Sequence, residues 1–416
     1  MSVCRGSARS LGWLSSGIAL LLACGVEEPN GVRQETQILN APDTTLGDIY
    51  GGAVSLSGNY AFVAAEWDDD DGKDSGAVWV FERSESEWTP TQKLRAPDAE
   101  AGDNFGRSIA MDGGLAVIGT HWDDSPGHKN AGSAYVYRLD EERWALEQKL
   151  VAKDPANWAA MGNAVSIHGN WIAVAAWRRA SGGDQGGVVY LFGREGKAWS
   201  QKQVLRASDA APMDQFGRGV WIDGDALVVG AWGDDERGKD AGAAYVFRLQ
   251  GERWIQEQKL TPLDAKPGDK FGFAVSLDDD VALIGSHLSS QGAPISGAAY
   301  VYRYDGERWA QEQKLVAESP LENESVGMSV AIQGDLALVS AHCSFQKVEN
   351  KPGSAYLFKR TDQRWELVSQ FKPSDSHAGD VFGFHLALDR RTAVLGSWRH
   401  KHAGRNSGRA YVFEDL

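Results

Sequence analysis

The sequence predicts an all-β chain folded as a seven-bladed β-propeller of four-stranded antiparallel blades, because three residues recur through it in one register. One glycine recurs in steps of 55 or 56 residues: Gly51, Gly106, Gly162, Gly217, Gly272, Gly327 and Gly383. A second glycine recurs in the same steps: Gly76, Gly132, Gly187, Gly242, Gly297, Gly353 and Gly408. A tryptophan marks six copies: Trp88, Trp144, Trp199, Trp254, Trp309 and Trp365. The shared register indicates seven copies of one structural unit.

Each unit reads as four short strands. In the second copy we expect strands at residues 105–111, 115–120, 133–137 and 144–150, with a tight turn at Gly113-Gly114 between the first two. Pairs of glycine, asparagine or aspartate at this turn suit two-residue hairpins, and helical periodicity is absent. A lone four-stranded sheet cannot bury both of its faces, so the units should pack side by side around a closed ring.

The two ends of the repeat region predict how the ring closes. The last copy stops at Tyr411-Val412-Phe413, after its third strand, and residues 34–39 match the end of a fourth strand. We therefore expect the N-terminal strand to complete the C-terminal blade, in a 3+1 closure. Of the three cysteines only Cys343 lies in the repeats, so no intramolecular disulfide can fasten the ring.

Residues 1–23 predict a signal peptide. Arg5 and Arg9 precede an apolar stretch, residues 11–22, that is too short to span a bilayer and ends at Leu21-Leu22-Ala23-Cys24. This order resembles a bacterial lipobox, whose cysteine is acylated and becomes the first mature residue. We expect an exported lipoprotein with a lipid on Cys24, a tether at residues 24–33 and a propeller at residues 34–416, anchored at the outer membrane or cell surface. Leu22 is unusual at its position, so cleavage by an ordinary signal peptidase is the alternative.

The charge of the chain bears on its partners. The formal net charge is −15 at pH 7. An acidic surface repels phosphate backbones, so the sequence argues against a nucleic-acid partner. Cations or polar neutral ligands suit such a surface better.

Two short elements recur around the first glycine and the second strand. Phe-Gly stands at Phe105-Gly106, Phe216-Gly217, Phe271-Gly272 and Phe382-Gly383, and a Gly-Ala or Gly-Ser element at Val229-Gly230-Ala231 and Ile284-Gly285-Ser286. With these elements the units resemble FG-GAP repeats, the propeller blades of integrin α-chain heads and of many bacterial surface proteins. The resemblance covers residues 34–416 and implies the propeller fold, which hosts many activities. Integrin-type blades often carry a DxDxDG calcium loop between FG and GAP. This chain has the tight turn there, so that site carries over to no residue.

Acidic loops follow the second strands, and the first of them is a candidate calcium site. It contains Asp68, Asp70, Asp71 and Asp74, and calcium takes six to eight oxygen ligands of this kind. The alternative is a solvated turn whose aspartates bond the backbone. Another aspartate precedes the Phe-Gly position in five copies, and its repetition favours turn capping over ligand binding: Asp48, Asp103, Asp214, Asp269 and Asp380.

The position after the GAP-like element is the main candidate for ligand binding. Equivalent positions of a propeller form a ring on one face, and here the ring comprises Glu66, His121, Trp177, Trp232, His287, His342 and Trp398. Aromatic and imidazole groups there can stack on sugar rings or peptide side chains of a glycan or protein ligand. The alternative is that they wedge between blades. A metal on His287 and His342 would lack a third ligand.

The sequence leaves three functions open. The first is a lipid-anchored, extracytoplasmic binding or adhesion module that uses the loop face. The second is a polysaccharide-active enzyme with an acid/base pair of loop carboxylates. The third is a structural surface protein without a specific small ligand. No HExxH, GxSxG, paired CxxC or Walker motif is present, so the sequence favours the first over the second.

Overall fold

A computed structural model describes residues 31–180, 183–342 and 351–416. The signal peptide, Cys24 and most of the expected tether lie outside these residues. The described part contains no helical segment of the length and hydropathy that crossing a bilayer requires.

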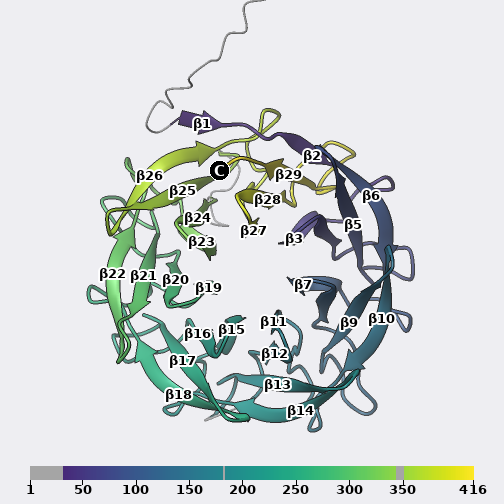
Figure 1. The fold of residues 1–416 in the computed structure, drawn as a ribbon, viewed down its shortest axis with the longest axis horizontal. Coiled ribbons are helices and arrows are strands. Elements are labelled where there is room, and N and C mark those ends of the chain that lie inside the picture. The colour runs from purple at the N-terminus through teal and green to yellow at the C-terminus, as the bar shows by residue number, and fades with distance from the viewer. Residues whose placement is uncertain (1–30, 181–182, 343–350) are drawn as a thin grey trace, which may run out of the picture.

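The described residues form strands arranged in seven sheets around one axis, as the repeats predicted (Figure 1). Blade 1 contains β3 (Tyr50–Ser57), β4 (Tyr60–Ala65), β5 (Ala77–Ser84) and β6 (Glu87–Leu94). Blade 2 contains β7 (Phe105–Asp112), β8 (Leu115–Thr120), β9 (Ser133–Asp140) and β10 (Arg143–Leu150). Blade 3 contains β11 (Ala164–His168), β12 (Trp171–Ala176), β13 (Val188–Glu195) and β14 (Ala198–Leu205). Blade 4 contains β15 (Phe216–Asp223), β16 (Ala226–Ala231), β17 (Ala243–Gln250) and β18 (Arg253–Leu260). Blade 5 contains β19 (Val275–Asp278), β20 (Val281–Ser286), β21 (Ala298–Tyr304) and β22 (Trp309–Leu315). Blade 6 contains β23 (Val326–Gln333), β24 (Leu336–Ala341), β25 (Ser354–Thr361) and β26 (Arg364–Phe371), with β1 (Gly31–Arg33) as a fifth strand. Blade 7 contains β27 (Leu386–Asp389), β28 (Thr392–Ser397), β29 (Arg409–Phe413) and β2 (Gln37–Leu39).

The ring closes as the termini predicted. β2 pairs antiparallel with β29 and supplies the outer strand of blade 7, so purple and yellow strands share one sheet in Figure 1. β1 adds a feature that the sequence did not predict. Its three residues, assigned to the tether, pair in parallel with β26 of blade 6. The start of the described chain therefore fastens two neighbouring blades.

The hydrophobic cores lie between blades. One core joins Phe62 and Val80 of blade 1 to Tyr135 and Trp144 of blade 2. The Trp144 ring meets Phe62 edge-on, with ring centroids 4.9 Å apart. The recurring tryptophans thus pack against the preceding blade. This burial gives each blade the second hydrophobic partner that it needs.

A belt of glutamines joins the outer strands. Gln92 donates through Nε2 to the Trp144 carbonyl (2.8 Å) and accepts through Oε1 from the Trp144 N–H (3.0 Å). The same paired bonds recur from Gln37, Gln148, Gln203, Gln258 and Gln313 to the tryptophan of the next blade. Between blades 6 and 7 the belt is interrupted. β26 has Ser369 at the belt position, and β1 pairs there instead.

The belt makes a stability prediction. Gln258→Ala removes both bonds to the Trp309 backbone and should lower the free energy of unfolding by about 2 kcal/mol. Gln250→Ala, at an exposed position of β17, is the control and should change it by less than about 0.5 kcal/mol. Urea unfolding measures both variants, and equal midpoints would contradict a role for the belt.

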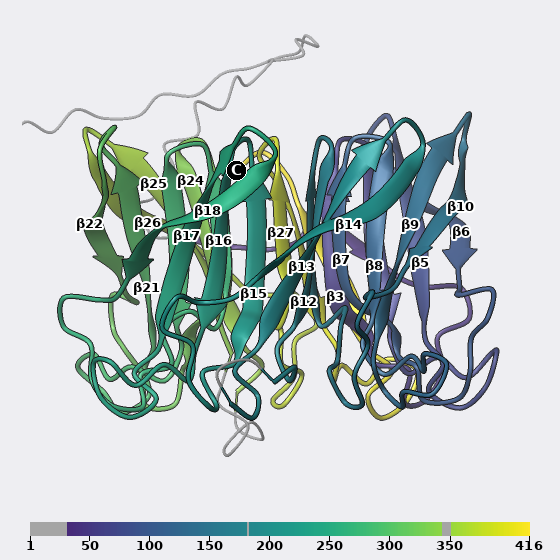
Figure 2. The same cartoon turned by 90° about the horizontal axis from the view of Figure 1, so that it is seen from below.

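The two ends of the ring differ (Figure 2). Short turns join first to second and third to fourth strands at one end, which we call the turn end. The longer connections, from second to third strands and from blade to blade, gather at the other, which we call the loop end. Residues at the starts of the inner strands and at the ends of the second strands therefore surround the loop-end mouth of the central channel.

Candidate functional site

The seven ring residues surround the loop-end mouth, but they do not form an exposed platform. Glu66, His121, His287 and His342 are buried, at 0–8% exposure. The three tryptophans are half-buried: Trp177, Trp232 and Trp398. The burial of the first four side chains agrees with the wedge interpretation, and ligand binding by the ring stays a prediction.

A second set of residues interleaves with this ring. It consists of the residues directly after the recurring first glycine, which the sequence analysis did not select. Phe273 lies 5.3 Å from Trp232 and 4.2 Å from His287, centroid to centroid. Phe384 lies 5.7 Å from His342 and 5.8 Å from Trp398. These rings fill much of the mouth with aromatic groups.

Cations cover the half-buried tryptophans. The nearest charged groups are Lys270 over Trp232 at 4.5 Å, Arg399 over Trp398 at 5.4 Å and Arg178 over Trp177 at 5.6 Å. A sugar ring that stacks here must use the opposite face of the indole or displace the cation. The three indole Nε1 atoms are buried and have no hydrogen-bond partner among the described residues.

Two arginines make the loop-end mouth positive. Arg107 lies 3.5 Å from a Glu66 carboxylate oxygen and donates to the Asn163 side chain at 3.3 Å. Arg218 makes no ion pair with any described residue, and its guanidinium lies 4.0 Å from the Phe273 ring centroid. Burial, and then the charge of Arg107, lower the pKa of Arg218 to about 9, so the side chain stays charged at pH 7.

Arg218 adjoins a cavity of about 150 Å³ at the axis. Its polar lining includes Ser108, Asn163, Arg218, Ser329 and His385, and its lining contains no carboxylate. Burial, followed by the charges of Arg107 and Arg218, lowers the pKa of His385 to about 3, so its imidazole is neutral at pH 7. The cavity offers neutral donors beside a guanidinium that has no counter-ion among the described residues.

The turn end has the opposite polarity. A cavity of about 270 Å³ there is lined by Asp112, Asp223, Asp278 and Asp389. Each of these aspartates accepts a hydrogen bond from the backbone of a neighbouring blade's turn, at 2.6–2.7 Å. Their place in the turns gives them a structural role. The lining of the loop-end cavity contains no carboxylate, so it does not supply the acid/base pair expected for a polysaccharide-active enzyme.

The candidate calcium residues do not converge as a set. Asp68 and Asp70 meet Asp43 from another loop, and the ammonium of Lys93 lies 2.7 Å from all three carboxylates. Asp71 pairs with Arg95 at 3.2 Å. Although burial opposes it, hydrogen bonding to these aspartates raises the pKa of Lys93 above its ordinary value.

Asp74 lies apart from the three carboxylates and donates its backbone N–H to Asp69. A lysine thus holds the position that a calcium ion would take. The same arrangement recurs around Lys149 and Lys259. These loops therefore fit a protonated lysine better than a metal.

We expect calcium to leave the melting temperature unchanged. Because the Lys93 ammonium already lies between Asp43, Asp68 and Asp70, about 5 mM calcium chloride and about 5 mM EDTA should give melting temperatures within about 1 °C of each other. In Lys93→Met the three carboxylates lose their cation, so calcium should stabilise that variant. Calcium-dependent melting of the unaltered protein would restore the calcium hypothesis.

The capping prediction is confirmed. In Asp103 the side chain accepts from the Glu100 N–H at 2.8 Å, three residues earlier. The other four aspartates make the same bond: Asp48, Asp214, Asp269 and Asp380. Glu324 does so in blade 6, a substitution that the Asp-x-Phe-Gly pattern missed.

The comparisons with known proteins agree with this architecture. No curated protein matches the chain significantly. The family model described as FG-GAP repeat matches seven segments: residues 34–81, 88–137, 144–192, 199–247, 254–302, 309–358 and 365–413. Each segment begins on a fourth strand and ends on the third strand of the next blade, so the repeat is offset from the blade by one strand. With these matches covering most of its length, the chain belongs to the FG-GAP repeat family.

Proposed function

We propose that this protein is an extracytoplasmic, lipid-anchored binding module that takes an acidic group of a protein or glycan ligand at the loop-end mouth. Membership of the FG-GAP repeat family points to a ligand-binding or adhesion-type module. The observation that carries the finer proposal is Arg218, a half-buried guanidinium without a carboxylate partner among the described residues.

A charge in such a place is costly. Surrounding a cation with protein removes water, and only a well-placed counter-charge offsets that loss. Arg218 has the face of Phe273 instead, which recovers a part of it. A ligand carboxylate or sulfate would supply the missing partner, with a bidentate geometry that guanidinium favours.

The surrounding charge supports the same ligand class. The net charge of −15 disfavours anions over most of the surface, so a positive mouth at one end gives an acidic ligand a single favoured approach. Arg107 stands beside Arg218, although Glu66 shares its charge. The indole N–H groups of Trp232 and Trp398, which have no hydrogen-bond partner in the described part of the chain, would add neutral donors.

The location rests on the N-terminal sequence. Residues 1–23 and Cys24 have the order of a lipoprotein signal, and acyl chains on Cys24 would hold the propeller at a membrane. Metabolic labelling with an alkyne-tagged palmitate should label the unaltered chain and not Cys24→Ser. A label retained in Cys24→Ser would refute lipidation at this residue.

The binding proposal is tested with matched acidic and neutral ligands. The Cys24→Ser chain is applied to arrays of uronic-acid and neutral oligosaccharides and of acidic and amidated peptides. Acidic members should be retained, and Arg218→Gln should weaken their binding at least about tenfold, or 1.4 kcal/mol. Arg143→Gln, at an exposed turn-end position, is the control. No retained ligand would favour the structural surface protein, and equal binding by Arg218→Gln would refute a role of Arg218 in ligand binding.

A further inference from the structure

Blade 7 lacks the lysine that pairs with aspartates at the loop end of four other blades. In blades 1, 2, 4 and 5 this lysine comes from the fourth strand: Lys93, Lys149, Lys259 and Lys314. The fourth strand of blade 7 is β2, and its register with β29 places Ile38 opposite Tyr411, where β6 places Lys93 opposite Trp79. The loop of blade 7 therefore receives no ammonium group from its outer strand.

A histidine replaces the loop aspartate in the same blade. In blade 1 the Asp68 carbonyl accepts from the second recurring glycine, Gly76, and in blade 7 the His400 carbonyl accepts from Gly408. His400 thus occupies the structural position of Asp68. An imidazole stands where blades 1, 2 and 4 have a carboxylate and its lysine.

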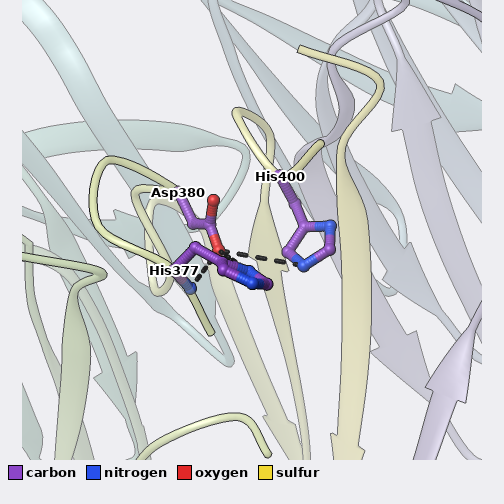
Figure 3. A group of neighbouring side chains, drawn as sticks. All are labelled: His377, Asp380 and His400. Atoms are coloured by element: carbon purple, nitrogen blue, oxygen red, sulfur yellow. Dashed lines mark hydrogen bonds and ion pairs between the residues drawn. The ribbon is translucent and has the colours of Figure 1, made fainter. Parts of the chain in front are cut away.

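The His400 imidazole lies near the Asp380 carboxylate, and the same carboxylate lies near a second histidine, His377 (Figure 3). The distance from His400 Nε2 to Asp380 Oδ2 is 3.8 Å, and that from His377 Nδ1 to the same oxygen is also 3.8 Å. One ligand atom of each residue lies within 4.8 Å of the other two. His377 and Asp380 belong to the connection from blade 6 to blade 7, and His400 to the connection between β28 and β29.

This environment sets Asp380 apart from the other capping aspartates. Asp48, Asp103, Asp214 and Asp269 cap the same turn and make no ion pair with any described residue, whereas Asp380 meets two imidazoles. Asp380 is 1% exposed, and its Oδ1 has no hydrogen-bond partner in the described chain. Buried polar atoms of this kind usually meet water or an ion.

The other charged groups nearby are already paired. Asp375 approaches His400 Nε2 at 3.4 Å, but it also accepts from the Tyr411 hydroxyl at 2.9 Å and forms an ion pair with Arg409. Its charge is therefore compensated within the blade. His377 is exposed and gives the cluster an open side toward solvent.

We propose that His377 Nδ1, Asp380 Oδ2 and His400 Nε2 bind a divalent transition-metal ion, with zinc as the best match and water as the fourth ligand. Two imidazoles and one carboxylate suit zinc, whereas calcium takes oxygen ligands almost exclusively. Tetrahedral zinc places ligand atoms about 3.3 Å apart, so each histidine needs to approach Asp380 by roughly half an ångström. The ion would join two loops of the blade that closes the ring.

Zinc titration of the full chain tests the site. The Cys24→Ser, Cys343→Ser background removes the thiols of the mature chain that compete for zinc. Isothermal titration calorimetry should detect one zinc ion per chain, and calcium in the same range should give no heat of binding. Cobalt should produce the visible absorption of a tetrahedral nitrogen and oxygen site.

Variants assign the ligands. His377→Ala removes an exposed ligand without disturbing the core and should weaken zinc binding at least about tenfold, and His400→Ala should do the same. His128→Ala, in a loop of blade 2, is the matched control and should bind as the background does. Equal zinc affinity in His377→Ala and the background, or an absence of saturable binding, would overturn the proposal. The acidic-ligand arrays test Arg218, which is not part of this cluster, so either result stands without the other.

Discussion

A chain that begins at Ala41, and therefore lacks β1 and β2, should not form a stable ring at 25 °C. β2 is the fourth strand of blade 7, and its Leu39 is fully buried in the core between blades 7 and 1. Loss of that side chain costs about 3 kcal/mol, and loss of the β2 backbone bonds and of the paired bonds from Gln37 to Trp88 adds several more. The sum approaches the whole stability of an ordinary domain, about 5–15 kcal/mol.

Circular dichroism and urea unfolding of the truncated chain measure the effect. A graded variant separates closure from general damage: Leu39→Ala should keep the fold and lose about 3 kcal/mol. Leu46→Ala is the matched control, because Leu46 is 67% exposed and should lose less than about 0.5 kcal/mol. A truncated chain with the melting temperature of the full one would show that β2 does not close the ring.

The fold was predictable because the residues that make contacts between blades recur in each unit. The Phe-Gly position, the second glycine and the outer tryptophan each mark a contact between blades, so their register defines the number of blades before any strand is assigned. The incomplete last copy and residues 34–39 predicted the closure by β2. β1 was not predictable, since three residues, Gly31 to Arg33, carry no alternation, and their parallel partner lies far along the chain.

The candidate site was only partly predictable, because its chemistry comes from separate loops. The register placed Trp232 and His287 at one mouth, but their burial depends on Phe273, one residue after a recurring glycine. Reading that position through all copies would also have found Arg218. The lysine beside Asp68 comes from a later strand, so the acidic loop alone resembled a metal site.

The His377–Asp380–His400 cluster was missed for the same reason. Asp380 fits the capping pattern of its repeat, which gave it a complete structural explanation. His377 and His400 stand at positions where the other copies have other residue types, and only the fold brings their two loops together. A prediction that relies on residues shared by all copies therefore misses a site built from residues that differ in one copy alone.

The second recurring glycine makes the strongest single-residue prediction. Gly242 has φ 87°, a conformation that side chains with a Cβ rarely adopt, and it bridges to Phe271 of the next blade. A Cβ at this position would lie 2.1 Å from the Phe271 carbonyl oxygen and 2.6 Å from its nitrogen. Both atoms are backbone, so no rotamer change relieves the clash. Gly242→Ala should lower the free energy of unfolding by about 4 kcal/mol, from backbone strain and overpacking together.

Gly251→Ala separates these two causes. Gly251 has φ 63°, also in the left-handed region, but a Cβ there would meet nothing within 4 Å. It should therefore lose only the conformational part, about 1 kcal/mol. Urea midpoints of both variants measure the difference, which reports the close approach of blade 4 to blade 5. Equal losses would mean that the blades can separate at this glycine without cost, and the recurrence of glycine at seven such positions would then need another cause.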